Sequence, residues 1–357
     1  MPPTPTGRAA QRMSEATSLE AKTIHRLLGY DASKGGFARN QGSPLDADFI
    51  IIDESSMLDT RLASSILNAV PNRASLVLVG DTNQLPSVGA GNVLKDIIDS
   101  GSISTTKLEK IFRQGSRSQI VVASHEILKG NSAIEGLVPT SINAVKPERD
   151  IHFIEALTPE ECVDACTRLA KIFIPRWYGA DKISGSQILA PMHKGSAGIG
   201  VLNSVLQKEL NTSQECASLG GTFFKEGDKI MQTRNNYDLD IFNGDMGIVK
   251  KICKEENKMS AKFENGIQEF SRTDCADLAL AYAISIHKSQ GSEFPIVIIP
   301  LLKQHFVMLQ RNLIYTAITR ARGKVFIVGD PYAFALAVKN SRTTQRRTAL
   351  KERLIWQ

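Results

Sequence analysis

The sequence predicts an α/β protein built from two doubly wound parallel-sheet domains. Two segments, SLVLVGD (75–81) and KVFIVGD (324–330), are short β-branched runs that close on Gly-Asp, and one lies in each half of the chain. Such runs fit strands that are buried on both faces of a parallel sheet. Because helical patterns separate the runs, they imply right-handed crossovers and doubly wound sheets. With 357 residues, the chain is long enough for two or three domains of ~100–200 residues each.

The remaining apolar runs follow the same plan. FIII (49–52) is followed by a helical pattern at 59–70, and a second helical pattern occupies 117–129. SQILAP (186–191) and PIVIIP (295–300) supply two further strands in the second half. The alternation of strand and helix is therefore expected in both halves.

Two segments depart from this plan. Between about 220 and 274, short strand patterns are separated by Gly, Asn and Asp turns, which is typical of a small antiparallel barrel. We expect this barrel to interrupt the second α/β domain, which resumes near Leu278. Residues 29–48 are polar and glycine-rich, which suits either a protruding hairpin or a disordered loop, and periodicity does not choose between them.

The charge is modestly basic. The net charge is +6 and the pI is near 9.0, which suits a polyanionic partner but is also common in proteins that bind none. The tail KNSRTTQRRTALKERLIWQ (339–357) holds six basic residues and one acid. It is interpreted either as a solvated helix end or as a phosphate contact.

Cysteine usage and hydropathy indicate a cytoplasmic protein. The five cysteines form no C-x-x-C pair and their number is odd, so we expect neither a disulfide framework nor a zinc site. No apolar run approaches the ~18–20 residues of a membrane span. The start, MPPTPTGRAAQRM, lacks the apolar core of a signal peptide. No membrane partner is expected.

Two carboxylates follow the first buried strand. Asp53 and Glu54 come directly after FIII, at a strand end that would face the ligand crevice of an α/β fold. Asp53 would hold Mg²⁺ through water, because Mg²⁺ prefers oxygen ligands and keeps much of its hydration. Glu54 would orient or deprotonate the attacking water of a phosphoryl transfer. An Asp-Glu pair after one strand is weak evidence alone.

A polar residue also follows the second strand. Gln84 lies in VGDTNQLPSVGAG (79–91), where its amide could donate to a γ-phosphate oxygen; the alternative is that Gly-Asp-Thr-Asn is only a turn. Arg113, Arg320 and Arg322 could stabilise charge on a transferred phosphoryl group. YTAITRAR is mostly apolar, so Arg320 is expected to project from a packed helix and to need a partner.

Nine segments together carry a family resemblance. In chain order they are TPTGRAAQRM, TIHRLLGY, DFIIIDESSM, LVLVGDTNQLPSVGAG, IFRQ, APMHKGSAG, IFNGDMG, YAISIHKSQGSEF and NLIYTAITRAR. Over nearly the whole chain, the sequence resembles the RecD-like superfamily 1 DNA helicases.

The resemblance implies a domain plan. It places a first RecA-like motor domain at 1–117, with a pin hairpin at about 29–48. A second RecA-like domain would comprise 118–219 and 275–357, interrupted by a Src-homology-type barrel at 220–274. ATP would bind in the cleft between the motor domains, with Mg²⁺ as cofactor.

The resemblance also implies an activity. Such enzymes use ATP to translocate 5′ to 3′ on single-stranded DNA and part a duplex at the pin, in DNA recombination and repair. The expected partners are single-stranded DNA and duplex junctions. Whether other recombination or repair subunits join is left open, and we expect a monomer.

Site residues are carried over position by position. Asp53 matches the Mg²⁺ ligand, Glu54 the catalytic acid and Gln84 the γ-phosphate sensor. Arg113 and Arg320 match the arginines that close on the phosphates. The nucleotide-binding positions are Asp53, Gln84, Arg113, Gly291, Glu293 and Arg320. The DNA-contacting positions are Pro5, Thr6, Gly7, Arg8, Thr23, His25, Arg26, Lys194, Asn243, His287, Lys288, Ser289 and Gln290. Polar donors of this kind suit reading of the DNA backbone without base choice. The ordinary alternative for His25 and His287 is a structural histidine.

One family motif is absent. The family has a G-x-x-x-x-G-K-[ST] phosphate loop roughly 25–30 residues before the PTG segment, but only four residues precede Pro5 here, and no such loop occurs elsewhere. A gene fragment, a shortened polypeptide and a degenerate paralogue all fit. We expect the chain alone not to turn over ATP. The alternative function is a single-stranded DNA-binding module with a degenerate ATPase site, and the DNA-side motifs argue against an unrelated P-loop enzyme.

Overall fold

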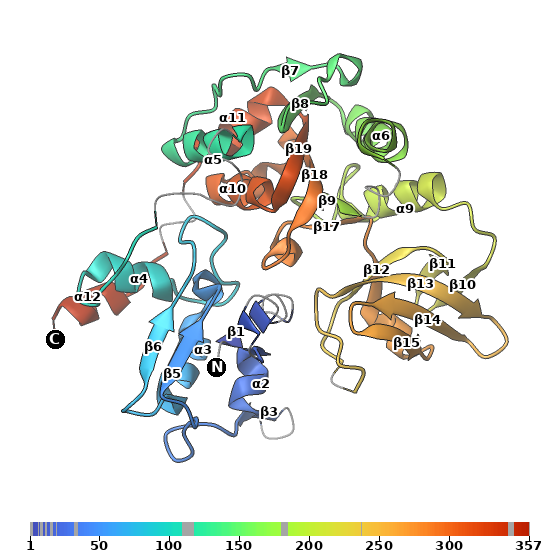
Figure 1. The fold of residues 1–357 in the computed structure, drawn as a ribbon. Coiled ribbons are helices and arrows are strands. Elements are labelled where there is room, and N and C mark those ends of the chain that lie inside the picture. Colours follow the sequence, from blue (N-terminus) through green and yellow to red (C-terminus); the bar gives the residue numbers. More distant parts are fainter. Residues whose placement is uncertain are drawn as a thin grey trace. The chain divides into compact units, whose positions relative to one another are not determined.

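The computed structural model divides the chain into two compact units (Figure 1). We call Met1–Lys110 with Arg342–Gln357 the N-terminal unit, and Ile111–Ser341 the central unit. The structure describes all residues except 1, 2, 6, 8, 9, 11, 12, 15, 16, 19, 32–34, 109–117, 180–184, 237, 342–345 and 357. In the described part, no helix is both long and apolar enough to cross a bilayer.

The N-terminal unit is organised around a βαβ unit. Strands β5 (Phe49–Ile52) and β6 (Ser75–Leu78) pair in parallel, and α3 (Thr60–Ala69) connects them. Asp59 caps the start of α3, and its carboxylate accepts from the Leu62 amide at 2.8 Å. This confirms the strands predicted at 49–52 and 75–81 and the helix at 59–70. Further helices that the structure describes in this unit are α2 (Ile24–Leu28), α4 (Val93–Ser100) and α12 (Leu350–Ile355).

Short strand pairs complete this unit. Strand β1 (Pro3–Thr4) pairs in parallel with β2 (Lys22–Thr23). Strands β3 (Tyr30–Asp31) and β4 (Gly36–Phe37) pair antiparallel, with Tyr30 opposite Phe37. Within residues 29–48 the structure thus pairs two short antiparallel strands.

The C-terminal residues group with the N-terminal unit. The sequence assigned 275–357 to the second motor domain, whereas the compact central unit ends at Ser341. Helix α12 packs against α4, and the Ser102 hydroxyl donates to the Leu354 carbonyl at 2.9 Å. Polar contacts between segments distant in sequence hold the C-terminal residues in this unit, and a local sequence pattern does not reveal them. One is the hydrogen bond from the Thr348 hydroxyl to the Asp96 carboxylate.

The central unit has a six-stranded, fully parallel sheet in the order β17-β9-β18-β19-β8-β7. Its strands are β7 (Pro139–Thr140), β8 (Ile151–Glu155), β9 (Ser186–Ala190), β17 (Ala283–Ser285), β18 (Phe294–Leu301) and β19 (Ala321–Gly329). The helices with described bounds in this unit are α5 (Gln119–Lys129), α6 (Pro159–Arg168), α7 (Ile174–Tyr178), α9 (Ile199–Leu210), α10 (Arg311–Thr319) and α11 (Pro331–Lys339). In Figure 1, α5, α10 and α11 lie on one face and α6 and α9 on the other. This confirms a doubly wound sheet in the second half.

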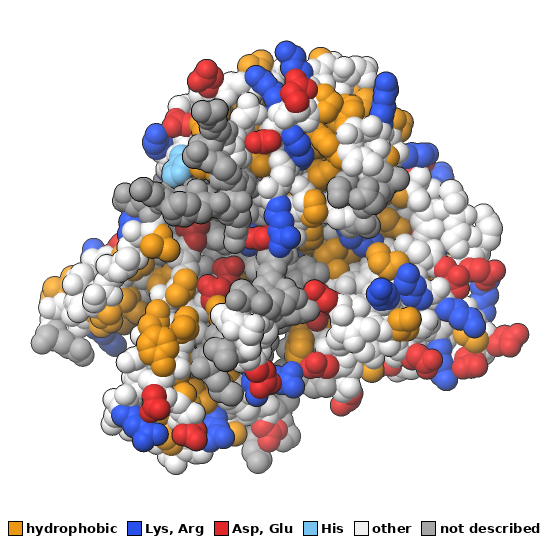
Figure 2. Space-filling view, in the orientation of Figure 1, with side chains coloured by type: hydrophobic (Ala, Val, Ile, Leu, Met, Phe, Trp, Pro, Cys, Tyr) orange, Lys and Arg blue, Asp and Glu red, His pale blue; other side chains and the backbone are white. Residues whose placement is uncertain are grey.

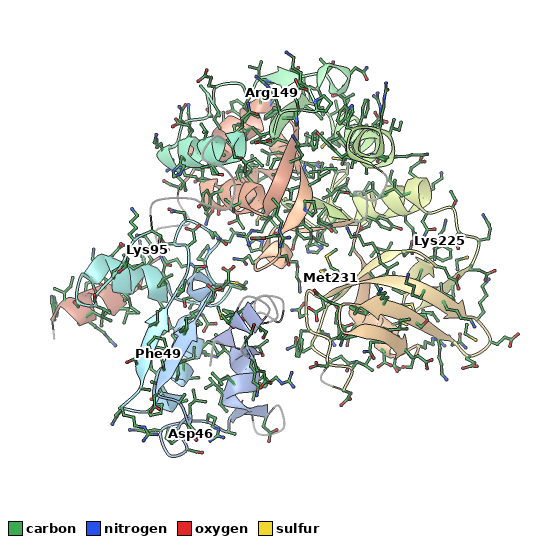
Figure 3. All side chains as sticks on the ribbon, viewed as in Figure 1. Asp46, Phe49, Lys95, Arg149, Lys225 and Met231 are labelled. Atoms are coloured by element: carbon green, nitrogen blue, oxygen red, sulfur yellow. The ribbon has the colours of Figure 1, made fainter. Side chains whose placement is uncertain are left out.

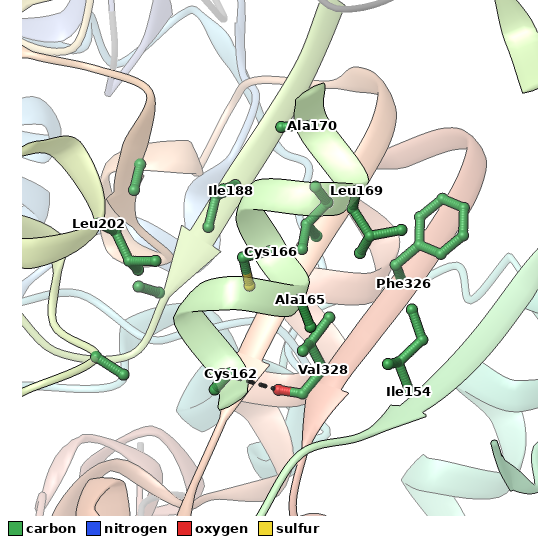
Figure 4. Close-up of a cluster of buried hydrophobic side chains, with 14 of the residues drawn as sticks. Ile154, Cys162, Ala165, Cys166, Leu169, Ala170, Ile188, Leu202, Phe326 and Val328 are labelled. Carbon is green, nitrogen blue, oxygen red and sulfur yellow. Dashed lines mark hydrogen bonds between the residues drawn. The ribbon is translucent and has the colours of Figure 1, made fainter. Parts of the chain in front are cut away.

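The core of the central unit lies between the sheet and α6 (Figure 4). Phe326 and Val328 of β19 pack there with Cys162 and Cys166, and the Cys162 thiol donates to the Val328 carbonyl at 3.4 Å. All five cysteines are free thiols. Cys162 and Cys166, one helical turn apart, therefore serve as packing residues here.

The insertion is antiparallel, as predicted, but it does not form a closed barrel. Its five-stranded sheet has the order β15-β14-β13-β12-β16, so β15 and β16 are edges, and β10 and β11 form a separate hairpin. The strands are β10 (Cys216–Leu219), β11 (Thr222–Lys225), β12 (Lys229–Gln232), β13 (Met246–Cys253), β14 (Lys258–Phe263), β15 (Gly266–Phe270) and β16 (Leu278–Leu280). Closure needs a ladder between the two edge strands, and turn spacing does not specify one.

A buried carboxylate joins the insertion to α9. Asp228 is fully buried and accepts from the side-chain amides of Gln207 (2.5 Å) and Asn211 (2.6 Å). The Tyr282 hydroxyl (2.9 Å) and the Lys225 amide (2.7 Å) donate to the same carboxylate. The Lys225 side chain, labelled in Figure 3, donates to the Asn211 carbonyl at 3.0 Å. Burial and the adjacent Asp228 charge raise the pKa of Tyr282, so its hydroxyl stays protonated as a donor.

This network predicts a large stability effect. Asp228→Ala would leave several buried donors without an acceptor, and each bond to a charged group contributes about 1.5–3 kcal/mol. We expect the free energy of unfolding, measured by urea titration, to fall by roughly 3–5 kcal/mol. Asp238→Ala, at an exposed aspartate of the same insertion, should change it by less than about 0.5 kcal/mol. Equal urea midpoints for the two variants would refute this role of Asp228.

Candidate nucleotide and DNA sites

The ends of β5 and β6 are hydrogen-bonded to each other. The Val79 amide donates to the Ile52 carbonyl at 2.7 Å, and the Ser55 amide donates to the Val79 carbonyl at 2.8 Å. Asp53 and Glu54 lie between these two bonds, and the Glu54 amide donates to the Asp53 carboxylate at 2.8 Å. The two acids are therefore fixed to the carboxyl edge of the sheet.

Glycine is required where the two strand ends meet. A Cβ on Gly80 would lie 2.9 Å from the Ser56 nitrogen and 3.0 Å from the Ser55 nitrogen, closer than real Cβ contacts. Glu54 itself has φ 53°, a left-handed conformation that is uncommon for residues other than glycine. The close packing around Gly80 holds Glu54 in this strained backbone.

Gln84 follows in the turn after β6. Its Nε2 donates to the Asp81 carboxylate at 3.4 Å. Its Oε1 is buried and has no hydrogen-bond partner among the described residues. A buried amide oxygen without a partner is unusual and needs an explanation. The structure thus places Asp53, Glu54 and Gln84 in one unit, after two adjoining strands.

The residues that follow Gln84 are held from two sides. We call residues 84–91 the sensor loop. The Thr60 amide of α3 donates to the Ala90 carbonyl at 2.9 Å, and Nη1 of Arg346 donates to the carbonyls of Gly89 (2.7 Å) and Gly91 (2.8 Å). Sequence reasoning did not identify Arg346, because nothing in the basic tail distinguishes it from its neighbours.

The structure describes only some of the arginines that the sequence predicts to contact phosphate. Arg113 lies outside the described residues. Arg320 directly follows α10 in the central unit and is 3% exposed, and its Nη1 donates to the Ser292 carbonyl at 3.4 Å. Glu293 forms an ion pair with Arg322, with 2.8 Å between Oε2 and Nε. Gly291, Glu293 and Arg320 therefore gather where β18 begins and α10 ends.

In the N-terminal unit, pairing of β1 with β2 brings two predicted DNA segments together. Pro5 and Gly7 follow β1, while Thr23 ends β2 and its hydroxyl accepts from the Arg26 amide at 3.2 Å, at the start of α2. Thr6 and Arg8 lie outside the described residues. His25 is surrounded by rings, with its centroid 5.7 Å from those of both Tyr30 and Phe37. Burial lowers the pKa of His25, and the Asp59 charge partly opposes this.

In the central unit, the insertion meets the IHKSQ segment. Lys288 donates to the Asn243 side-chain oxygen, so two predicted DNA contacts from distant segments touch. Burial lowers the pKa of both His287 and Lys288.

The other predicted DNA positions of the central unit are placed differently. Ser289 is fully buried and its hydroxyl donates to the Ile286 carbonyl at 2.7 Å, and Gln290 is also buried. Lys194 is exposed in the loop between β9 and α9. Figure 2 shows basic and acidic side chains interspersed among the described residues of this face.

Comparison with known proteins identifies three family models along the chain. Residues 2–90 match an AAA domain, 202–263 the SH3 domain of ATP-dependent RecD-like DNA helicases, and 280–328 a UvrD-like helicase C-terminal domain. Their order follows the segments that the resemblance rests on.

Curated relatives match over nearly the whole chain. The ATP-dependent RecD2 DNA helicase of Deinococcus radiodurans is 35% identical over 350 residues, covering 98% of this chain and 45% of that protein. The RecBCD enzyme subunit RecD of Mycolicibacterium smegmatis is 30% identical, covering 98% of this chain and 65% of that protein. The chain thus spans about half to two thirds of the length of these relatives.

Solved structures give the fold. A Bacteroides Pif1 structure bound to single-stranded DNA superposes with a TM-score of 0.53 at 19% identity, covering 96% of this chain and 85% of that one. Candida albicans Pif1 helicase gives 0.50 at 17% identity, covering 96% and 92%. The fold is that of Pif1- and RecD-like helicases, with a parallel sheet of the RecA-like type, and the chain belongs to the RecD-like helicase family.

Proposed function

We propose that residues 1–357 are the larger part of an ATP-dependent helicase motor, one that moves 5′ to 3′ along single-stranded DNA in recombination and repair. The observation that carries this proposal is the hydrogen-bonded junction of β5 and β6, which fixes Asp53, Glu54 and the Gln84 turn at one sheet edge. Its partners would be single-stranded DNA and duplex junctions in the cytoplasm. We propose that the motor domains follow the expected division, except for the C-terminal residues.

The residues present fit Mg²⁺ and the terminal phosphate of ATP. Asp53 offers a carboxylate whose orientation is fixed by the Glu54 amide, and it would hold Mg²⁺ through water. Glu54 would accept a proton from the attacking water. The buried Gln84 Oε1 supports a sensor role, because a ligand-bound water or hydroxyl could satisfy it. Arg320 and Arg113 would neutralise phosphate charge, and Gly291 and Glu293 would line the sugar.

The DNA site rests on the Lys288–Asn243 contact. Burial disfavours the charged form of Lys288, and a DNA phosphate would offset that penalty with a charge-assisted bond. The Asn243 amide would hold the lysine in place until the phosphate arrives. We propose that the insertion, the family's SH3-type domain, supplies this second contact to the DNA backbone.

A helicase motor of the proposed kind would also need a phosphate loop. Residues 1–357 contain no G-x-x-x-x-G-K-[ST] segment. The two-stranded sheet β5–β6 also exposes apolar side chains, with Phe49 52% and Val77 38% exposed, whereas parallel sheets are normally covered. Figure 2 shows apolar side chains gathered over this sheet, where Figure 3 labels Phe49. These features support the proposal that a further strand with its phosphate loop completes the site.

A second candidate function follows from the same gap. The DNA-side residues are present without a phosphate cradle, which favours a single-stranded DNA-binding module that does not hydrolyse ATP.

We predict salt-dependent DNA binding that involves Lys288. Residues 1–357 should bind labelled oligonucleotides without sequence preference, with log K falling by ~0.7 per log unit of salt for each neutralised phosphate. Lys288→Ala should weaken binding and reduce the slope by about 0.7, whereas Lys250→Ala, at an exposed lysine of the insertion, should leave both unchanged. Absence of binding at the lowest salt would refute both candidate functions.

We predict that residues 1–357 release no phosphate from ATP, even with single-stranded DNA. Losing several charge-assisted contacts of ~1.5–3 kcal/mol each moves micromolar binding to the millimolar range or beyond. A polypeptide with a phosphate-loop segment before Met1 should hydrolyse ATP on adding DNA. In it, Glu54→Gln should reduce turnover by about 10²-fold or more and spare nucleotide binding. Hydrolysis by residues 1–357 that Glu54→Gln abolishes would show that the cradle is dispensable. No hydrolysis by the extended polypeptide would favour the DNA-binding module.

We predict that the β3–β4 hairpin is the wedge that parts the duplex. Replacing residues 32–35 by Asn-Gly should keep Asp31 paired with Gly36, because two-residue turns of this type suit hairpins, while shortening the tip. In the extended polypeptide, forked-duplex unwinding should fall severely while DNA-stimulated ATP hydrolysis persists. Unwinding at the unaltered rate would remove the wedge role.

A further inference from the structure

Arg346, which lies near the C-terminus, forms hydrogen bonds with four acceptors of the sensor loop. Its Nη1 donates to the Gly89 and Gly91 carbonyls, as described above. Nη1 also reaches the Ser87 hydroxyl at 3.1 Å, and Nη2 donates to the Ser87 carbonyl at 2.6 Å. Three carbonyls and a hydroxyl of one short loop thus converge on one guanidinium. Only arginine presents planar, forked donors that can serve such a set together.

The loop has little freedom on its opposite side. A Cβ on Gly89 would lie 2.2 Å from the Asp59 carboxylate, and one on Gly91 would lie 2.1 Å from the Thr60 hydroxyl. Gly91 also has φ 111°, which residues with side chains rarely adopt. The loop is therefore wedged between the start of α3 and Arg346, with Ser87 buried and Val88 91% exposed.

The sensor loop is connected to the proposed nucleotide-binding residues in two ways. Gln84 begins the loop, and its buried Oε1 lacks a partner among the described residues. Asp59 and Thr60, which contact the loop, follow Glu54 in the same DESSMLDT segment. A displacement of residues 87–91 would therefore act on Gln84 directly and on the Glu54 segment through α3.

We infer that Arg346 is a positioning residue for the proposed γ-phosphate sensor, and that the tail bearing it is a working part of the ATP site. This rests on the proposed function. The guanidinium of Arg346 holds the carbonyls of the sensor loop in place. It thereby positions the backbone that carries the Gln84 side chain, and it does not itself contact the nucleotide. The tail follows α11, the last helix of the central unit. Because Arg346 lies more than 250 residues after the sensor loop in the chain, the conformation of the loop depends on a segment that is distant in sequence.

The contact can be tested on residues 1–357 by hydrogen–deuterium exchange. Arg346→Ala should accelerate exchange of peptides covering 84–91 by about ten-fold or more, and Arg346→Lys should have an intermediate effect. Arg347→Ala is the matched control, because Arg347 is the exposed neighbour of the same type. Added guanidinium at low millimolar concentration should partly restore protection in Arg346→Ala alone. Unchanged exchange of the loop in Arg346→Ala would overturn the inference.

The positioning role is tested in the extended polypeptide that carries a phosphate loop. Arg346→Ala should lower kcat for ATP by about 10²-fold, since small misplacements cost that much, with KM and DNA affinity changed less than about two-fold. Gln84→Ala should cost nearly as much, and the double variant should be no worse than either. Additive losses, or an unchanged kcat, would overturn the positioning role. If the unaltered polypeptide does not hydrolyse ATP, the proposed function and the sensor role both fail, and the exchange experiment alone decides whether Arg346 orders the loop.

Discussion

The arrangement of the candidate nucleotide site depends on two backbone hydrogen bonds that join the ends of β5 and β6 through Ile52, Val79 and Ser55. These bonds bring a carboxylate pair from one strand beside a turn from the next. The approach is so close that only glycine fits at position 80. Chemistry at a parallel-sheet edge needs groups from different strands at fixed separations, and backbone hydrogen bonds set those separations more rigidly than side-chain packing does.

In the central unit, the corresponding constraint is a buried carboxylate. Asp228 accepts hydrogen bonds from Gln207 of α9 and from Asn211 directly after it, from the insertion, and from Tyr282 in the segment that leads back to the parallel sheet. A buried carboxylate with several donors fixes one arrangement of these elements, because any other leaves the charge unsolvated. The contact between Asn243 and Lys288 forms where the insertion's own loop meets the parallel-sheet segment. The orientation of the insertion therefore also determines whether the two proposed DNA-contacting side chains meet.

The sequence was most informative where a pattern is local. The β-branched runs that became β5, β6, β9, β18 and β19 were recognised from their own residues, and the motif order identified the family. The sequence predicted a barrel, but the insertion is an open sheet, because closure depends on pairing between the edge strands β15 and β16, for which no local pattern gives a signal. The tail could not be placed for the same reason: Arg346 finds its acceptors in residues 87–91, and its neighbours are equally basic. Among the candidate site residues, the sequence identified positions but not environments, such as the burial of Ser289 or the pairing of Glu293 with Arg322.

The left-handed backbone at Glu54 affects which residues evolution would favour at this position. A side chain at φ 53° strains the fold by on the order of 1–3 kcal/mol, and glycine or asparagine would relieve much of that strain. Folding and chemistry therefore favour different residues at this position. Once a lineage no longer needs hydrolysis, mutation toward glycine there gains stability and loses nothing. Continued selection for ATP turnover would keep a glutamate in this conformation. Without that selection, neutral drift would tend to replace it.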